Sequence, residues 1–144
     1  MSDEHFRKLE NMYHAAPINR FYEPRLTIER GRTELSFAAR PELHHAAGAV
    51  HGSVYFKALD DAAFFAVSSL VEGVFVLTAS FHLHLLKPVS LGTLLARGMV
   101  VHETKSTFVA DAVLVDADGT ALARGSGSFV RSKIPLTPAM GYAV

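Results

Sequence analysis

Two adjacent carboxylates, Asp60 and Asp61, are the residues of this sequence whose setting points most directly to chemistry. They lie within residues 50–71, an apolar stretch that contains no proline and no glycine after Gly52. Its length and its content of Ala, Leu and Phe predict one long helix. A carboxylate whose pKa is shifted by such a helix environment is a candidate for work in an active site.

Asp60 is expected to face apolar surroundings. At about 100° per residue its neighbours on a helical wheel are apolar, among them Phe56, Phe64 and Val67. A carboxylate in such a setting must be paired, hydrogen-bonded or protonated, and desolvation raises its pKa. Asp60 is therefore a functional candidate, and the alternative is a carboxylate bonded to backbone groups of a neighbouring loop.

Asp61 belongs to a different face of the same helix. It shares a narrow polar stripe with Lys57 and Ser68, and Lys57 precedes it by one helical turn. This spacing brings opposite charges together on a helix. We therefore expect a solvated ion pair between Lys57 and Asp61.

The composition limits the class of protein. A chain of 144 residues is long enough for one domain, and without cysteine it has neither a disulfide nor a thiolate metal site. The formal net charge is zero and no basic run occurs, which argues against a nucleic-acid partner. The start of the chain lacks the apolar core of a signal peptide, and no stretch is long enough to span a bilayer. We expect a cytoplasmic protein that does not contact a membrane.

Apolar periodicity predicts the elements that surround the central helix. A helix is expected at residues 3–15, capped by Ser2 or Asp3 and ended by Pro17, with a linker up to residue 20. Alternation with a period of two predicts the strands, and residues 132–144 form a tail without clear periodicity. The expected strands are Arg25–Glu29, Thr33–Ala39, Val74–Leu86, Thr93–Glu103, Thr107–Val115 and Thr120–Arg131.

Short connections between these strands imply antiparallel neighbours. One long helix against one antiparallel sheet gives a two-layer α+β domain that spans residues 1–144. In the strand after the helix, strict alternation puts Leu77 and Phe81 on one face and Thr78 and His82 on the other. The sheet leaves two free edges, so edge-to-edge dimerisation is expected.

A motif at the start of the central helix now becomes informative. His51, Gly52 and Ser53 are followed, after six residues, by Asp60, and Thr78 stands ten residues before a proline. In order and spacing this resembles the hotdog-fold acyl-CoA thioesterases of the phenylacetate-degradation type, whose pattern is His-Gly-Gly, six residues and Asp. The resemblance covers roughly residues 23–131. It implies a hotdog fold, in which an antiparallel sheet wraps around one long central helix.

The resemblance also implies an activity, the hydrolysis of a small-molecule acyl-CoA to a carboxylic acid and free coenzyme A. Asp60 is then the general base or the nucleophile, and Thr78 orients the attacking water. Free N–H groups near Gly52 hold the developing oxyanion, and His51 holds the loop or donates to the carbonyl. The alternative for His51 is a residue that only caps the local backbone at the start of the helix. Coenzyme A enters as part of the substrate, so neither a cofactor nor a metal is expected.

The helix geometry favours a site shared between two subunits. Nine residues rise about 13 Å, and they put His51 and Asp60 on opposite faces of the helix. A second helix running in the opposite direction brings the two together, as the His-Gly turn of one family subunit faces the Asp of the other. We expect a homodimer or a dimer of dimers.

Two positions depart from the family pattern, and both are expected to contact substrate. Ser53 replaces the second glycine and could supply a helix N-cap. His45 stands six residues before His51, where the family often has Asn, and a neutral His donates a hydrogen bond in one tautomer only.

Other functions stay open at this point. A hotdog domain can bind acyl-CoA without hydrolysing it, or act as a hydratase or dehydratase. His82 and His84 have a spacing that can bind zinc, but no third ligand is evident.

Overall fold

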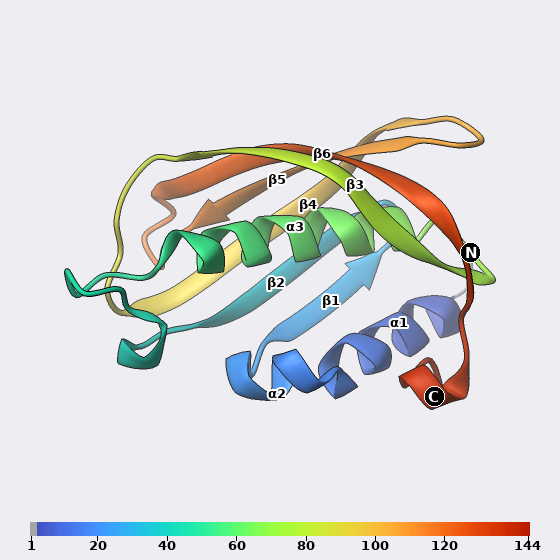
Figure 1. Ribbon diagram of the computed structural model, residues 1–144, viewed down its shortest axis with the longest axis horizontal. Coiled ribbons are helices and arrows are strands. Elements are labelled where there is room, and N and C mark those ends of the chain that lie inside the picture. Colours follow the sequence, from blue (N-terminus) through green and yellow to red (C-terminus); the bar gives the residue numbers. More distant parts are fainter. Residues whose placement is uncertain (1–2) are drawn as a thin grey trace.

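One long helix, α3 (Gly52–Ser68), lies across one face of a six-stranded antiparallel sheet (Figure 1). The computed structural model describes residues 3–144, so the alternative helix cap at Ser2 lies outside the described residues. The strand order is β1-β2-β4-β5-β6-β3. The strands are β1 (Arg25–Glu29), β2 (Arg32–Ala39), β3 (Val74–Leu85), β4 (Gly92–Glu103), β5 (Phe108–Val115) and β6 (Ala121–Pro135). This arrangement confirms the predicted α+β class, with the sheet curved around one helix.

Small residues let α3 approach the sheet closely. Ala58, Ala62 and Ala66 are fully buried on its inner face. Gly98 of β4 lies directly below the helix, where a Cβ atom would come within 2.2 Å of the Ala62 carbonyl oxygen. The hydroxyl of Thr33 donates to that same oxygen at 2.6 Å. These contacts fix the rotation of α3 and so decide which side chains face the sheet, the flanks and the outside.

The N-terminal segment differs from the expected helix and linker. α1 (Asp3–Ala15) is as predicted, but a second short helix, α2 (Pro17–Tyr22), follows where a linker was expected. Pro17 occupies the first turn of α2, a position at which proline is favoured because its missing N–H needs no partner. The same residue therefore ends one helix and begins the next.

α1 covers the free edge of β1 (Figure 1). The N–H of Ile28 donates to a Glu10 carboxylate oxygen at 2.7 Å, and the N–H of Leu26 donates to His14 Nε2 at 3.1 Å. Side chains of α1 thus satisfy backbone groups that an edge strand leaves open. The opposite edge, β3, has no such cover among the described residues.

The end of the chain is more ordered than its sequence indicates. β6 continues four residues beyond the predicted end, because Val74 at the start of β3 pairs with Pro135. A short helix, η2 (Pro138–Met140), follows, and the last residues pack on α1. There the hydroxyl of Tyr142 lies 2.6 Å from Nδ1 of the buried His5.

A further short helix, η1 (Pro41–Leu43), precedes the loop that leads into α3. Within residues 3–144 no helix has both the length and the apolar character needed to cross a membrane.

Candidate active site

Asp60 meets Thr78 at the flank of α3. The hydroxyl of Thr78 on β3 donates to Asp60 Oδ1 at 2.9 Å. No other hydrogen-bond donor to this carboxylate is found within residues 3–144. The structure thus brings two of the predicted catalytic residues together and leaves most of the carboxylate's acceptor capacity unused.

A β-bulge aims Thr78 at the helix. Thr78 pairs with Phe129 and Ser80 with Ser128, so Ala79 is an extra residue in β3. The predicted alternation, which put Thr78 on the same face as His82, is therefore wrong on the N-terminal side of the bulge. Leu77 points outward there and is 42% exposed, whereas Thr78 faces α3. Bulges commonly redirect a side chain beside a functional site.

The environment of Asp60 shifts its acidity. Burial raises the pKa of the Asp60 carboxyl to about 6, and the neighbouring Asp61 charge acts in the same direction. The hydrogen bond from Thr78 and the charge of Lys57 oppose this rise. A carboxyl with a pKa near 6 can accept a proton at neutral pH and release it again within the same reaction cycle.

Asp61 is held differently. Its Oδ2 accepts a hydrogen bond from the Tyr13 hydroxyl at 2.6 Å and lies 2.7 Å from Lys57 Nζ. Lys57 also lies 5.0 Å from the ring centre of Tyr22. The predicted ion pair is confirmed, but its predicted solvation is wrong, since the Lys57 and Asp61 side chains are only 14% and 17% exposed. α1 and α2 cover this stripe.

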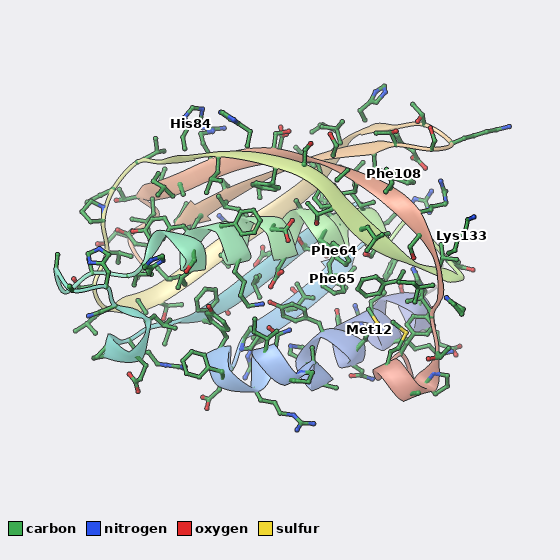
Figure 2. All side chains as sticks on the ribbon, viewed as in Figure 1. Met12, Phe64, Phe65, His84, Phe108 and Lys133 are labelled. Atoms are coloured by element: carbon green, nitrogen blue, oxygen red, sulfur yellow. The ribbon has the colours of Figure 1, made fainter. Side chains whose placement is uncertain are left out.

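An apolar cavity of about 240 Å³ opens beside Asp60. Residues of α1, α2, α3 and β3 line it, and Phe64, Phe65 and Phe75 form aromatic walls. Figure 2 shows Phe64 and Phe65 in the layer between α3 and α1. Sequence reasoning did not find this cavity, because its walls come from four elements and one of them, α2, was not predicted.

The start of α3 forms a second group of candidate residues. His51 is the N-cap, because its Nδ1 accepts a hydrogen bond from the Ser53 N–H at 3.0 Å. Ser53 therefore does not cap the helix as considered above; its hydroxyl lies 2.8 Å from the same Nδ1. Within the described chain the N–H of Gly52 has no acceptor. It is a free donor at the positive end of the helix dipole.

His45 lies in the exposed loop before α3. Its Nδ1 accepts a hydrogen bond from the Ala47 N–H at 3.1 Å. The ring proton of neutral His45 is therefore on Nε2, which makes that nitrogen a donor. Ser90 holds the loop in place by donating to the Gly48 carbonyl oxygen at 2.8 Å.

The two groups of candidate residues do not meet within one chain. Asp60 and Thr78 lie together, whereas His45, His51, Gly52 and Ser53 lie toward the start of the helix. His51 and Asp60 are about 13 Å apart along the helix axis. Within one chain the two groups therefore stay separate.

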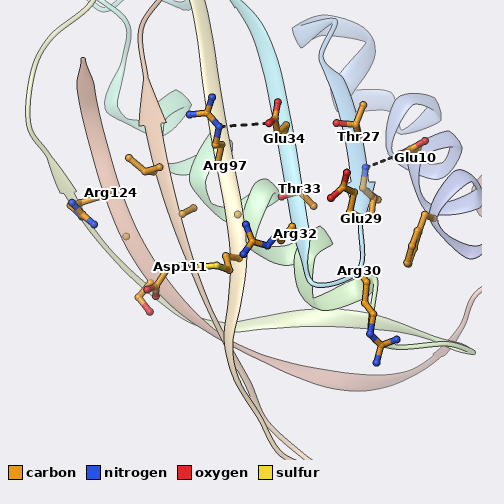
Figure 3. A pocket seen from close by; sticks show the side chains of 18 of the residues that line it. Glu10, Thr27, Glu29, Arg30, Arg32, Thr33, Glu34, Arg97, Asp111 and Arg124 are labelled. Atoms are coloured by element: carbon orange, nitrogen blue, oxygen red, sulfur yellow. Dashed lines mark hydrogen bonds and ion pairs between the residues drawn. The ribbon is translucent and has the colours of Figure 1, made fainter. Parts of the chain in front are cut away.

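A larger hollow lies elsewhere, on the outer face of the sheet (Figure 3). Its volume is about 1320 Å³, and charged side chains of both signs line it, including Arg97, whose Nε lies 3.7 Å from a Glu34 carboxylate oxygen. None of the predicted site residues lines it. His82 and His84 lie at its margin with ring centres 5.0 Å apart, and no third His, Asp or Glu within residues 3–144 joins them to hold a metal.

Comparisons with known proteins bear on the family and the fold of the chain. The sequence profile of the thioesterase superfamily matches residues 47–123. A protein of Saccharolobus solfataricus, assigned as an esterase, is 30% identical over 103 residues, which cover 72% of this chain and 69% of that protein. The matched residues contain α3 with His51, Gly52 and Asp60.

Solved structures show the same fold. The PaaI protein of the E. coli phenylacetic acid degradation operon has a TM-score of 0.85 at 21% identity, covering 94% of this chain and 99% of that one. A thioesterase family protein of Silicibacter pomeroyi has a TM-score of 0.80 at 27% identity, covering 87% and 96%. The course of the whole chain thus has parallels among solved structures.

Proposed function

Because the chain belongs to the thioesterase superfamily, and is on that ground a thioester hydrolase with the hotdog fold, we propose that it hydrolyses acyl-CoA thioesters to a carboxylic acid and free coenzyme A. The observation that carries this proposal is the Asp60 carboxyl. It is half-buried beside an apolar cavity, burial raises its pKa to about 6, and among the described residues a single hydroxyl, that of Thr78, donates to it.

In the proposed reaction Asp60 takes a proton from a water molecule as that water attacks the thioester carbonyl carbon. The C–O bond forms, the carbonyl π electrons move to the oxygen, and the resulting oxyanion is held by N–H groups at a helix start. When the oxyanion collapses, the C–S bond breaks and the thiolate of coenzyme A takes the proton from Asp60. Thr78, bonded to Asp60 Oδ1, fixes the carboxylate orientation and leaves Oδ2 for the water.

Direct attack by Asp60 on the carbonyl, giving an anhydride, is the second route open to this carboxylate. One turnover in water labelled with heavy oxygen separates the two routes. A general base puts the label into the released acid. A nucleophile passes its own unlabelled oxygen to that acid when water attacks the Asp60 carbonyl carbon of the anhydride, and the label then stays on Asp60.

The proposal includes a homodimer, or a dimer of dimers, with shared sites. The β3 edge supports it, because α1 covers the other edge and leaves β3 free to pair. Leu77 and Leu85 on β3 are 42% and 56% exposed, as expected for residues that a second copy covers. A second α3 running antiparallel would place its Gly52 N–H opposite Asp60.

Two inactive variants test this sharing. Asp60→Asn protein and Gly52→Pro protein each lack one half of a site, and Gly52→Pro removes the free N–H. A mixed dimer contains one intact site of two, so each mixed dimer should have about half of the wild-type activity, and random exchange at equal amounts should restore about a quarter in the mixture. An active monomer at working concentration, seen by light scattering, contradicts the shared site.

His45, His51 and Ser53 complete the proposed site at the partner's helix start. The Nε2–H of His45 can donate to the thioester carbonyl, as an Asn amide would at that position. His51 and Ser53 hold each other and fix the first turn of the helix. In this proposal water and these side chains carry out the hydrolysis, so no cofactor and no metal take part. The proposal also includes a cytoplasmic location, where the protein would meet its acyl-CoA substrates.

A panel of acyl-CoAs with a thiol-detecting reagent tests the function. Release of free thiol is expected for at least one member of the panel. Tight binding without thiol release would indicate a binding module, and a change in acyl saturation without thiol release would indicate a hydratase or dehydratase. Either result overturns the proposal.

A further inference from the structure

Two histidines form a close pair on the outer face of the edge strand β3. His82 and His84 are both exposed, and their ring centres lie 5.0 Å apart. Figure 2 shows His84 on the side of the strand that faces away from α3. A zinc ion with tetrahedral ligands about 2.0–2.1 Å away holds two imidazole rings with their centres about 5 Å apart. The pair therefore has the spacing of two zinc ligands, and among residues 3–144 no third ligand joins it.

Contacts between α3 and β3 show which residues of the two elements lie at the same level. A Cβ atom on Gly52 would lie 3.2 Å from Leu85 Cδ1, so Leu85 lies beside the start of the helix. Further along the helix, the hydroxyl of Thr78 donates to Asp60 at 2.9 Å. β3 thus runs antiparallel to α3. The midpoint between Gly52 and Asp60 on the helix corresponds to residues 81–82 on the strand.

The twofold axis of the proposed dimer passes at this same level. In that dimer the N–H of Gly52 lies opposite the partner subunit's Asp60, so the axis passes midway between these positions of α3, near Phe56. Phe56 packs edge-on against Phe81 of β3, with ring centres 5.6 Å apart. The axis therefore crosses the paired β3 strands beside Phe81 and its outward-facing neighbour His82. Opposite residues of an antiparallel pair share one face of the sheet, so His82 lies next to the partner subunit's His82.

We propose that the β3 edges of the dimer form a zinc site, in which His82, His84 and the partner subunit's His82 bind one ion and water completes the coordination. His84 is a diagonal neighbour of the partner subunit's His82, at a Cα separation of about 7–8 Å that two imidazoles can bridge. The inference rests on the homodimer of the proposed function. The ion lies on the opposite face of the sheet from Asp60, so it joins the subunits and takes no part in hydrolysis.

The charges around the histidine pair are of both signs. Arg124 of β6 pairs with His84, and its guanidinium opposes a bound cation. Asp111 of β5 pairs with Ser126, which in turn pairs with His82, so the Asp111 carboxylate favours a bound cation. The binding is therefore left to the imidazoles themselves. Neutral imidazole is a ligand that suits zinc, whereas magnesium and calcium prefer oxygen ligands.

The test titrates Zn²⁺ into untagged dimeric protein and measures the bound metal after dialysis. The wild-type protein should bind one zinc ion per two chains, because the site uses histidines of both. His82→Asn removes two of the three ligands, so it should weaken zinc binding by at least about a hundredfold, the upper end of the loss caused by an outer-shell change. His84→Asn removes one ligand and should weaken it by about tenfold or more. Magnesium should not compete.

His102→Asn is the matched control, since His102 is an exposed histidine of β4 outside the pair. It should bind zinc as the wild type does. A wild-type dimer that binds no zinc overturns the proposal, and so does a folded His82→Asn protein with wild-type affinity. Thiol release should continue in the presence of a chelator, so loss of the zinc site leaves the proposed hydrolysis standing. Absence of thiol release from every acyl-CoA overturns the proposed function and leaves the zinc result to be judged by itself.

Discussion

Asp60 and Asp61 are adjacent in the chain and both are largely withdrawn from water, yet they lie in opposite kinds of site. Asp61 accepts from the Tyr13 hydroxyl and pairs with Lys57, so two donors, one of them charged, hold its carboxylate. Within residues 3–144 Asp60 accepts a hydrogen bond from Thr78 alone, and burial raises its pKa to about 6. Burial is common to both residues. The number and charge of the donors decide which carboxylate stays free to react.

The contacts of Asp61 also stabilise the surroundings of Asp60. Asp61 ties Tyr13 of α1 to the outer stripe of α3 and, with Lys57 beneath Tyr22, keeps α1 and α2 in place. Burial and the Asp61 carboxylate raise the pKa of Tyr13, so its hydroxyl stays protonated and donates. Asp61 thereby helps to hold in place the helices that line the cavity beside Asp60. Four changes can break or sharpen this contrast.

Asp60→Asn should have the largest effect on turnover. The amide keeps the volume but cannot take the proton from water, so hydrolysis should fall by at least about a hundredfold. The melting temperature should stay the same or rise, because a desolvated charge has been removed. Thiol release and thermal unfolding measure the two effects. A fully active Asp60→Asn protein would place the reaction elsewhere.

Asp61→Asn should show the reverse pattern. It leaves the half-buried Lys57 without its carboxylate, so the free energy of unfolding should fall by about 1–3 kcal/mol. Turnover at a temperature where the variant is folded should fall much less than in Asp60→Asn. Denaturant unfolding and the thiol assay on one preparation test this. A dead but fully stable Asp61→Asn protein would mean that the roles are exchanged.

Thr78→Val should have a smaller effect that depends on pH. The hydroxyl stabilises the ionised carboxyl, so its loss should raise the Asp60 pKa further and move the rise of kcat/KM to higher pH. Near neutral pH the loss should be about tenfold or less. A pH–rate profile measures it, and an unshifted profile would mean that the hydrogen bond does not reach the reacting group.

His45 should show the smallest change when it is replaced by the family's residue. His45→Asn retains a donor and should keep or raise the activity, whereas His45→Ala removes the donor and should lower it. Equal rates for wild type and both variants would place His45 outside the site.

The sequence-based predictions hold where a pattern is local. The period of 3.6 places α3, and the wheel distinguishes Asp60 from Asp61, because both depend on residues within two turns of one helix. Errors arise where distant segments decide. The bulge at Ala79 follows from pairing with β6, and the covering of Asp61 by Tyr13 links residues 48 positions apart. The helix α2 was missed because Pro17 ends one helix and starts another.

The ionisation of Asp60 should make the free energy of unfolding depend on pH. Its pKa is higher in the folded protein than the unfolded value of 3.8, so the folded state binds the proton more tightly. The resulting stabilisation is complete below pH of about 4 and is lost as the pH rises through about 6. Asp60→Asn should remove this part of the pH dependence.

Titration of the Asp60 carboxyl by carbon NMR tests the central claim most directly. The resonance of Asp60 is identified as the one that disappears in Asp60→Asn. It should titrate near pH 6, and addition of the Thr78→Val change should move the midpoint higher. A midpoint near the ordinary aspartate value of about 3.9 would contradict the account, because Asp60 would then be a solvated carboxylate like any other.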